Sequence, residues 1–160
     1  MSDDSNVIDF ERRVALSRAM HTDYLLTDLD SATLKGIFDV AFIDAHVDDD
    51  GDCVVRDDIT LIATTDPGKE HFKVYAFFPT SGTREQALEF CNKFNLHLVV
   101  VRAQVRDTPA SDGQWPVIFD YDRLVFDDER IEARSIVKTV RRFEAIVRNG
   151  ISRYDEDKIF

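Results

Sequence analysis

The sequence of 160 residues is 44% hydrophobic and 11% aromatic, which is enough for one domain with a substantial core. Its formal net charge of −11 at pH 7 argues against non-specific binding to nucleic acid or to an anionic membrane, because both depend on a positive field. We therefore expect neither a nucleic-acid partner nor a membrane partner.

The sequence contains two cysteines, Cys53 and Cys91, and both lie within apolar patterns that lack metal-ligand spacing. This usage favours free, buried thiols in a reducing compartment, with a disulfide between them as the alternative. The first residues are acidic and lack the basic and apolar regions of a signal peptide, and no apolar stretch approaches the length of a membrane span. A cytoplasmic location is therefore expected.

The first half of the chain changes from helical to alternating spacing. Residues 1–22 are interpreted as a partly helical N-terminal extension, and the apolar residues between Leu34 and Ala41 predict the next helix. Asp50-Gly51 is a strong hairpin signal, because glycine tolerates a positive φ. Strands are predicted at residues 43–48, 52–56 and 70–78, and the run at 59–65 is either a further strand or the continuation of the one before it.

The strongest helix signal lies between Thr83 and Asn95. Thr83 offers a hydroxyl for the N-cap, and the following apolar residues recur at the spacing of one helix face, namely Ala87, Leu88, Cys91 and Phe94. Since strand-like runs lie on both sides of it, we interpret this helix as the bridge between a three-strand half and a two-strand half of the domain. Its position predicts that Cys91 is buried and unreactive.

Two strands and a last helix are predicted after this bridge. Leu96 to Arg106 is expected to be a strand that is apolar on both faces in its first half, and Trp115 to Phe126 is expected to be the last strand. A final helix from about residue 130 is expected to end at a Gly150 C-cap. Residues 151–160 are interpreted as a C-terminal tail.

The predicted order is therefore (α)-α-β-β-β-α-β-β-α, with residues 23–150 forming a single domain. Hairpin signals and one-sided burial are typical of an antiparallel sheet, and interspersed helices are expected to pack against one of its faces. The fold class is α+β.

One layer of helices leaves the other face of the sheet open. Tyr75, Phe77, Leu98 and Val100 are predicted to form an apolar patch on that open face. Contiguous exposed apolar surface usually marks an interface, and a symmetric homodimer is its simplest use. The alternative is that the N-terminal helix covers this face.

The acidic run from Asp48 to Asp52 suggests a second hypothesis, a small-ligand or calcium sensor. With Gly51 at the sixth position of a calcium loop, the first position is His46 and the last is Asp57, where a carboxylate and a bidentate glutamate are needed. An acidic hairpin turn is therefore favoured. We predict no cofactor and no metal.

The final helix carries a basic stripe formed by Arg134, Lys138, Arg141 and Arg148. In so acidic a protein this stripe is a candidate docking surface for an anionic partner. A solvated helix face is the simpler interpretation.

Four blocks of the sequence resemble, in order and spacing, the YbjN-domain family of bacterial proteins: D-D-D-G-D-C-V-V-R-D-D, A-L-E-F-C-N-K-F-N, F-D-Y-D and I-V-K-T-V-R-R-F. Such proteins are described as proposed sensory transduction regulators. The resemblance implies a fold like that of type III secretion chaperones, a small and commonly dimeric α+β domain that binds other proteins. It implies no catalytic residues. Arg56, Asp57 and Asn92 are polar members of these blocks, and we interpret them as structural, with a binding role as the alternative.

No nucleophile motif, paired general base or phosphate-binding loop occurs in the sequence, so we do not expect an enzyme. The favoured hypothesis is a non-enzymatic protein-binding regulator or chaperone-like adaptor. It is expected to form a cytoplasmic homodimer and to bind a protein partner of unknown identity.

Overall fold

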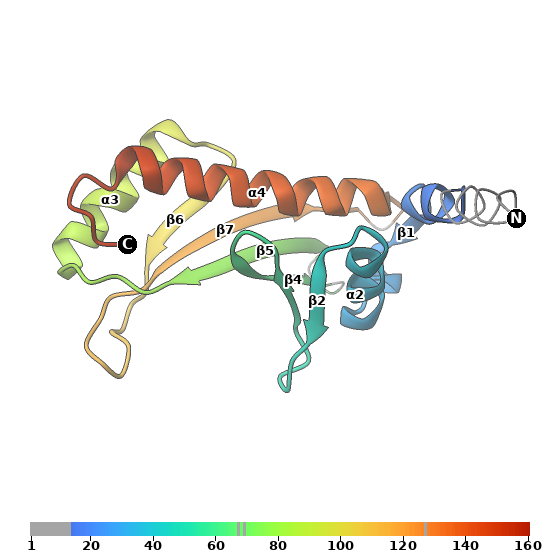
Figure 1. Ribbon diagram of the computed structural model, residues 1–160, viewed down its shortest axis with the longest axis horizontal. Helices are drawn as coiled ribbons and strands as arrows, with labels where there is room; N and C mark the ends of the chain where they lie inside the picture. The colour runs from blue at the N-terminus through green and yellow to red at the C-terminus, as the bar shows by residue number, and fades with distance from the viewer. Residues whose placement is uncertain (1–13, 67, 69, 127) are drawn as a thin grey trace, which may run out of the picture.

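Hydrophobic alternation and helical spacing together produce an α+β fold. The computed structural model describes residues 14–66, 68, 70–126 and 128–160 (Figure 1). After a helical segment at residues 14–20, the elements are β1 (Asp23–Leu25), η1 (Leu26–Asp28), α2 (Ser31–Val40), β2 (Asp44–Val47), β3 (Cys53–Arg56), β4 (Thr60–Asp66), β5 (His71–Phe78), α3 (Arg84–His97), β6 (Arg102–Val105), β7 (Val117–Leu124), β8 (Arg130–Glu132) and α4 (Ala133–Tyr154).

The main sheet has six strands in the order β2-β3-β4-β5-β7-β6, and every neighbouring pair is antiparallel. This arrangement confirms the predicted fold class. A hairpin joins β2 to β3, and Gly51 in its turn has a φ of 86°, as the Asp50-Gly51 signal predicts. Four strands of this sheet, β2 to β5, precede α3, because β4 is a strand of its own and not the continuation of β3.

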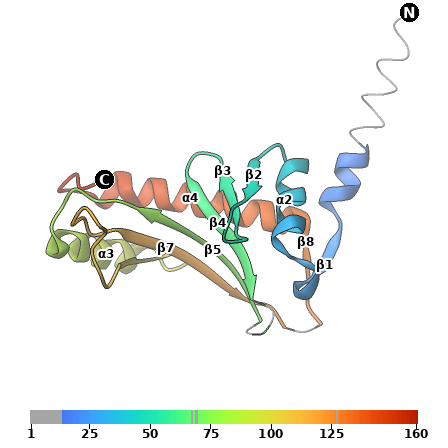
Figure 2. The same cartoon turned by 90° about the horizontal axis from the view of Figure 1, so that it is seen from below.

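The three labelled helices pack on one face of the six-stranded sheet (Figure 1, Figure 2). Phe119 of β7 lies at the centre of this layer, 5.1 Å from the ring of Phe94 and 6.0 Å from that of Phe90, both on α3. Val140 and Phe143 of α4 are buried in the same core. The opposite face of the sheet has no helix over it among the described residues.

The helix predicted from Thr83 is confirmed, together with its cap. Thr83 Oγ1 accepts a hydrogen bond from the Gln86 backbone N–H at 3.3 Å, and Gln86 Oε1 accepts one from the Thr83 backbone N–H at 2.9 Å. This reciprocal capping box satisfies two donors at the start of α3. The core-facing residues include Cys91 and Phe94, as the spacing predicts.

The predicted strand from Leu96 to Arg106 is wrong in its first half. Helix α3 continues to His97, and β6 begins only at Arg102. Leu98 follows Phe94 by one helical turn and packs against the core, whereas Val100 lies in the connection to β6 and is 61% exposed. The chain needs this connection to turn from the helix into the sheet, which overrides the β-propensity of the apolar run.

The end of the chain is also more ordered than the sequence indicates. Helix α4 runs through Gly150 to Tyr154, so this glycine is not a C-cap. After a turn, Ile159 is buried and its carbonyl accepts a hydrogen bond from the Ser81 backbone N–H at 2.8 Å. The Phe160 ring lies 4.7 Å from that of Phe90. Residues 151–160 therefore complete the core beneath α3 rather than forming a separate tail.

A small second sheet precedes α4, where a longer helix is predicted. β8 pairs antiparallel with β1, and Tyr24 lies opposite Ile131. The backbone N–H of Ala133 donates to the carbonyl of Thr22 at 2.9 Å. Residues 22–25 are thereby attached to the beginning of α4.

Candidate functional site

The open face of the six-stranded sheet carries an apolar centre. Strand register places one row of side chains across all six strands on this face: His46, Val54, Ile62, Tyr75, Asp120 and Arg102. The neighbouring row contains Phe77 and Ile118. Phe77 is 51% exposed, and its ring meets that of Tyr75 edge to face with a centroid distance of 5.6 Å. The rows form a surface that is apolar in the middle and that no helix of the described chain covers.

A charged pair borders this apolar centre on the β6 side. The Arg102 guanidinium donates from Nε to Asp120 Oδ1 at 3.1 Å and from Nη2 to Asp120 Oδ2 at 2.5 Å. These bonds raise the pKa of Arg102, and they satisfy a carboxylate that is otherwise buried. The pair holds two strands together and marks the rim of the apolar surface.

The structure separates the four residues predicted for the open face. Tyr75 and Phe77 lie there, whereas Leu98 belongs to the core and Val100 lines a groove on the helix side. Val54, Ile62 and Ile118 take their places. The sequence indicates Val54 and Ile62, because the runs C-V-V and L-I-A that contain them are apolar on both faces of a strand.

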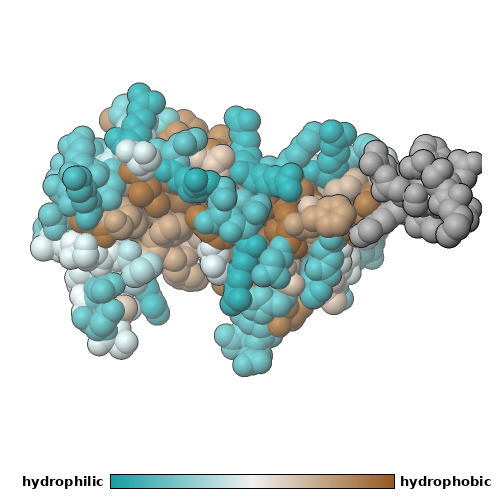
Figure 3. All heavy atoms as spheres, viewed as in Figure 1, coloured by the Kyte–Doolittle hydropathy of each residue, from teal (hydrophilic) through white to brown (hydrophobic). Residues whose placement is uncertain are grey.

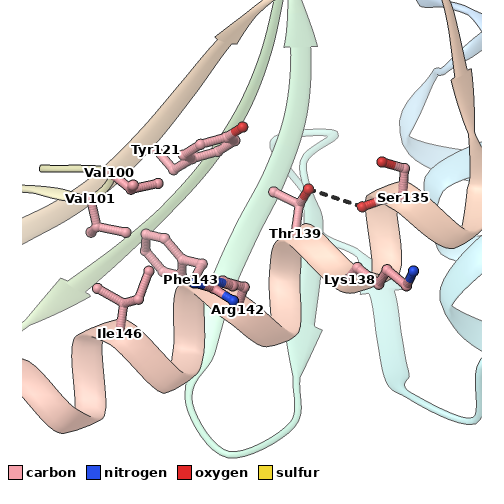
Figure 4. A pocket seen from close by; sticks show the side chains of 9 residues that line it. All are labelled: Val100, Val101, Tyr121, Ser135, Lys138, Thr139, Arg142, Phe143 and Ile146. Carbon is pink, nitrogen blue, oxygen red and sulfur yellow. Dashed lines mark hydrogen bonds between the residues drawn. The ribbon is translucent and has the colours of Figure 1, made fainter.

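A groove of about 260 Å³ lies between α4 and the β6–β7 end of the sheet (Figure 4). One stripe of α4 forms a wall, with residues at helical spacing: Ser135, Lys138, Thr139, Arg142 and Ile146. Val100, Val101, Tyr121 and Phe143 line the rest. Figure 4 shows that the apolar residues gather at one end, while Ser135 and Lys138 lie at the other. The Thr139 hydroxyl donates to the Ser135 carbonyl at 2.9 Å.

The structure brings together three of the four residues of the predicted basic stripe. Lys138 lines the groove just described, and it also borders a second hollow that contains Arg134 and Arg141. Arg148 forms an ion pair with Asp58 in the β3–β4 turn. Arg142, which is absent from the predicted set, is the second cation of the groove.

The polar residues of the family blocks lie at the surface. Arg56, Asp57 and Asn92 are all exposed. The structural role predicted for Asn92 belongs instead to Asn95, whose Nδ2 donates to the Ala103 carbonyl at 2.7 Å. Asn95 Oδ1 accepts from the Ala103 backbone N–H at 2.8 Å. One amide side chain therefore ties the end of α3 to β6.

The acidic hairpin uses its first carboxylate to close its own turn. Asp48 Oδ1 accepts hydrogen bonds from the backbone N–H groups of Asp50 at 3.1 Å and Asp52 at 2.9 Å. In the part of the chain that the structure describes, no three His, Cys, Asp or Glu side chains are grouped so as to hold a metal ion. Calcium binding by this hairpin stays the alternative hypothesis, which calorimetry with calcium tests.

Glu144 is a buried acid on α4. Burial raises its pKa to about 7, and the nearby carboxylate of Asp57 adds to this effect. A hydrogen bond with the Ile59 backbone and the charge of Arg141 partly oppose it. Its Oε1 atom has no hydrogen-bond partner among the described residues. Burial therefore favours the protonated form of this carboxyl more than in an exposed glutamate.

None of the described helices is long and apolar enough to cross a membrane. No protein-family model and no curated protein matches the sequence.

The structure defines a class: a six-stranded antiparallel main sheet with helices on one face, which is the YbjN-like α+β fold. One solved structure that matches is the crystal structure of YbjN from E. coli, described as a proposed transcription regulator. The TM-score is 0.61 at 12% sequence identity, and the match covers 80% of this chain and 93% of that chain. At this identity the likeness establishes the fold alone.

Proposed function

We propose that the protein is a non-enzymatic regulator that acts by binding other polypeptides, and that it self-associates as a homodimer through the open face of its sheet. The observation that carries this proposal is the apolar centre formed by Ile62, Tyr75, Phe77 and Ile118, with Val54 largely buried beside them. Burying such a surface against a second copy removes it from water, which is the main favourable contribution to association.

The geometry of this face favours a symmetric contact. A two-fold axis that lies parallel to the sheet brings the same face of two copies together, so the apolar centre of one copy packs on that of the other. Arg102 and Asp120 already satisfy each other at the rim, so the contact leaves neither charge unpaired. The likeness to YbjN supports a regulatory role by analogy of fold.

Replacement of Phe77 by Asp tests the self-association. This side chain is half-exposed, so the variant is expected to fold, while a buried carboxylate at the contact opposes dimer formation. Phe42→Asp is the matched control, since Phe42 is exposed in the turn between α2 and β2. Light scattering is expected to give a dimer mass for the wild type and for the control, and a monomer mass for Phe77→Asp. A wild-type mass of one chain at high concentration refutes self-association.

A further inference from the structure

Strand β7 is twice as long as the strand that pairs with its outer side. It runs from Val117 to Leu124, and β5 pairs with all of it. On the other side, β6 covers only Val117 to Asp120, with Arg102 opposite Asp120. From Tyr121 to Leu124 no strand of the described chain pairs with this side of β7.

The alternation of backbone directions along a strand shows which N–H and C=O groups point toward the unpaired side of β7. The N–H of Val125 donates to Glu70 on the β5 side, and the N–H of Arg106 donates to Pro116 on the β6 side. In an antiparallel ladder the bonding direction alternates along the strand, so even-numbered residues of β7 point away from β5. The N–H and C=O groups of Asp122 and Leu124 therefore face the vacant edge.

The outer edge of β6 differs from this edge of β7, because Ala103, one of the two residues of β6 whose backbone faces outward, is already bonded at both backbone atoms by Asn95. Such covering protects an edge strand from pairing with another chain. Residues 98–101 lead from α3 into β6 and do not pair with β7, which leaves the edge of β7 beyond Tyr121 without equivalent cover.

The groove lies beside this vacant edge. Its apolar end contains Val100, Val101 and Phe143, and Tyr121 belongs both to the groove and to the edge. Leu124 is 59% exposed and Phe126 is 63% exposed at the far end of β7. Figure 3 shows hydrophobic residues in a band below α4, over β6 and β7. The edge of β7 and the α4 stripe thus border the same groove.

The charge of the groove selects among extended chains. Lys138 and Arg142 are exposed, and within the described residues neither forms an ion pair with a carboxylate. Helix α4 bears Glu144 as its single acid, against Arg134, Lys138, Arg141, Arg142, Arg148 and Arg153. The groove is thus locally basic in a protein of net charge −11.

We propose that the free edge of β7 takes up an extended segment of a partner protein by strand addition, with a carboxylate of that segment at Lys138 and Arg142. The proposal rests on the proposed role of this chain as a protein-binding module and names the chemistry of its partner. Main-chain hydrogen bonds to Asp122 and Leu124 supply the pairing, and the groove selects the side chains.

Register defines the segment further. Val101 precedes Arg102 and takes the place opposite Tyr121, so a strand that continues the line of β6 pairs only as far as Asp122. Its side chain opposite Arg123 points toward α4, and its next residue reaches the level of Tyr121 beside Val101. The apolar end of the groove lies at the level of Tyr121. The segment therefore carries an apolar residue there and an acidic residue two positions earlier.

Peptides with selective backbone methylation test the strand addition. The probe is a short fluorescein-labelled peptide centred on Thr-Glu-Thr-Val, with its threonines opposite Leu124 and Asp122. Methylating the two threonine nitrogens removes the N–H groups that bond β7, and about tenfold weaker binding by fluorescence anisotropy is expected. Methylating the Glu and Val nitrogens, which face solvent, is the control and is expected to change little. Equal effects of the two methylations, or no binding up to millimolar peptide, overturn the proposal.

Hydrogen exchange tests the edge directly. In the free protein the amides of Asp122 and Leu124 are expected to exchange faster than those of Tyr121 and Arg123, which bond β5. Saturating peptide is expected to slow the first pair. If a rise in protein concentration protects these amides and peptide does not, the edge joins two copies of the chain and the assignment to a partner peptide is wrong.

Charge reversal tests the groove. Lys138→Glu with Arg142→Glu is expected to weaken peptide binding about tenfold, while Arg134→Glu with Arg153→Glu, which changes the net charge equally, is expected to change it little. Equal weakening by both pairs refutes a specific role of the groove. Phe77→Asp is expected to leave peptide binding intact. If the wild-type protein is a dimer but binds no peptide, strand addition is refuted and self-association is not. If it is a monomer that binds the peptide, self-association is refuted and strand addition is not.

Discussion

Gly150→Ala is expected to destabilise the protein, although the same change inside a helix normally stabilises it. Gly150 is buried in α4 where this helix crosses α3. A Cβ atom at this position lies 2.2 Å from Cε2 and 2.6 Å from Cδ2 of Phe94, and 3.0 Å from Cδ1 of Leu98. The Phe94 ring is fully buried against Phe119, so it has no free space into which to move.

The size of the effect follows from two opposing contributions. Alanine favours a helix interior over glycine by about 1 kcal/mol. Relief of the contact to an ordinary 3.4 Å requires a shift of 1.2 Å, the difference between 3.4 Å and 2.2 Å, in a close-packed region. Overpacking of this kind costs up to about 3 kcal/mol. The net loss in the free energy of unfolding is therefore about 2 kcal/mol.

Urea denaturation followed by circular dichroism measures this loss. Gly36→Ala is the matched control, since Gly36 lies inside α2 and a Cβ there meets no atom within 4 Å. It is expected to raise the free energy of unfolding by roughly 0.5–1 kcal/mol. Opposite signs for the two substitutions support the packing argument. A Gly150→Ala variant as stable as the wild type refutes it, because the predicted contact then costs nothing.

Three further expectations follow from buried polar and thiol groups. The raised pKa of Glu144, about 7 against an ordinary 4.5, means that the folded state holds its proton more tightly, so stability falls as pH rises from about 4.5 to 7 and stays low above. Glu144→Gln is expected to abolish this fall and to stabilise the protein at pH 8 by up to about 3 kcal/mol in urea titrations, and an unchanged pH profile contradicts the reasoning. Asn95→Ala is expected to cost about 1–2 kcal/mol and to speed amide exchange at Ala103; unaltered exchange there means that the two bonds contribute little. Burial raises the pKa of Cys53 to about 11 and that of Cys91 to about 12, so native labelling by a thiol reagent is expected to be far slower than in urea, and rapid native labelling argues against both positions.

The parts of the fold that the sequence predicts well are those set by neighbouring residues. The helix after Thr83 has its cap, its spacing and its buried face encoded within one stretch. The hairpin at Asp50-Gly51 depends on a single backbone conformation. Such local preferences survive folding because the tertiary structure agrees with them.

The parts that the sequence does not predict depend on distant contacts. Leu98 and Val100 lie in an apolar run that is typical of a strand. The connection from α3 to β6 nevertheless places Leu98 against the core and Val100 in a groove. Gly150 has the appearance of a cap, and only the ring of Phe94 shows why glycine is needed. Of the predicted interface, Tyr75 and Phe77 could be found by alternation alone, whereas the vacant edge of β7 requires knowledge of where β6 begins.

The pairing of β1 with β8 has a consequence for the order of folding events. His21 and Glu132, which flank this ribbon and meet through a 2.5 Å contact, are separated by 111 residues. Closing a loop of that length costs on the order of 4 kcal/mol of chain entropy, while each strand of the ribbon contributes only three residues. The hairpins from β2 to β5 close far shorter loops. The ribbon is therefore expected to form after the six-stranded sheet and to open before it. Local opening of the ribbon is expected to leave the rest of the domain folded.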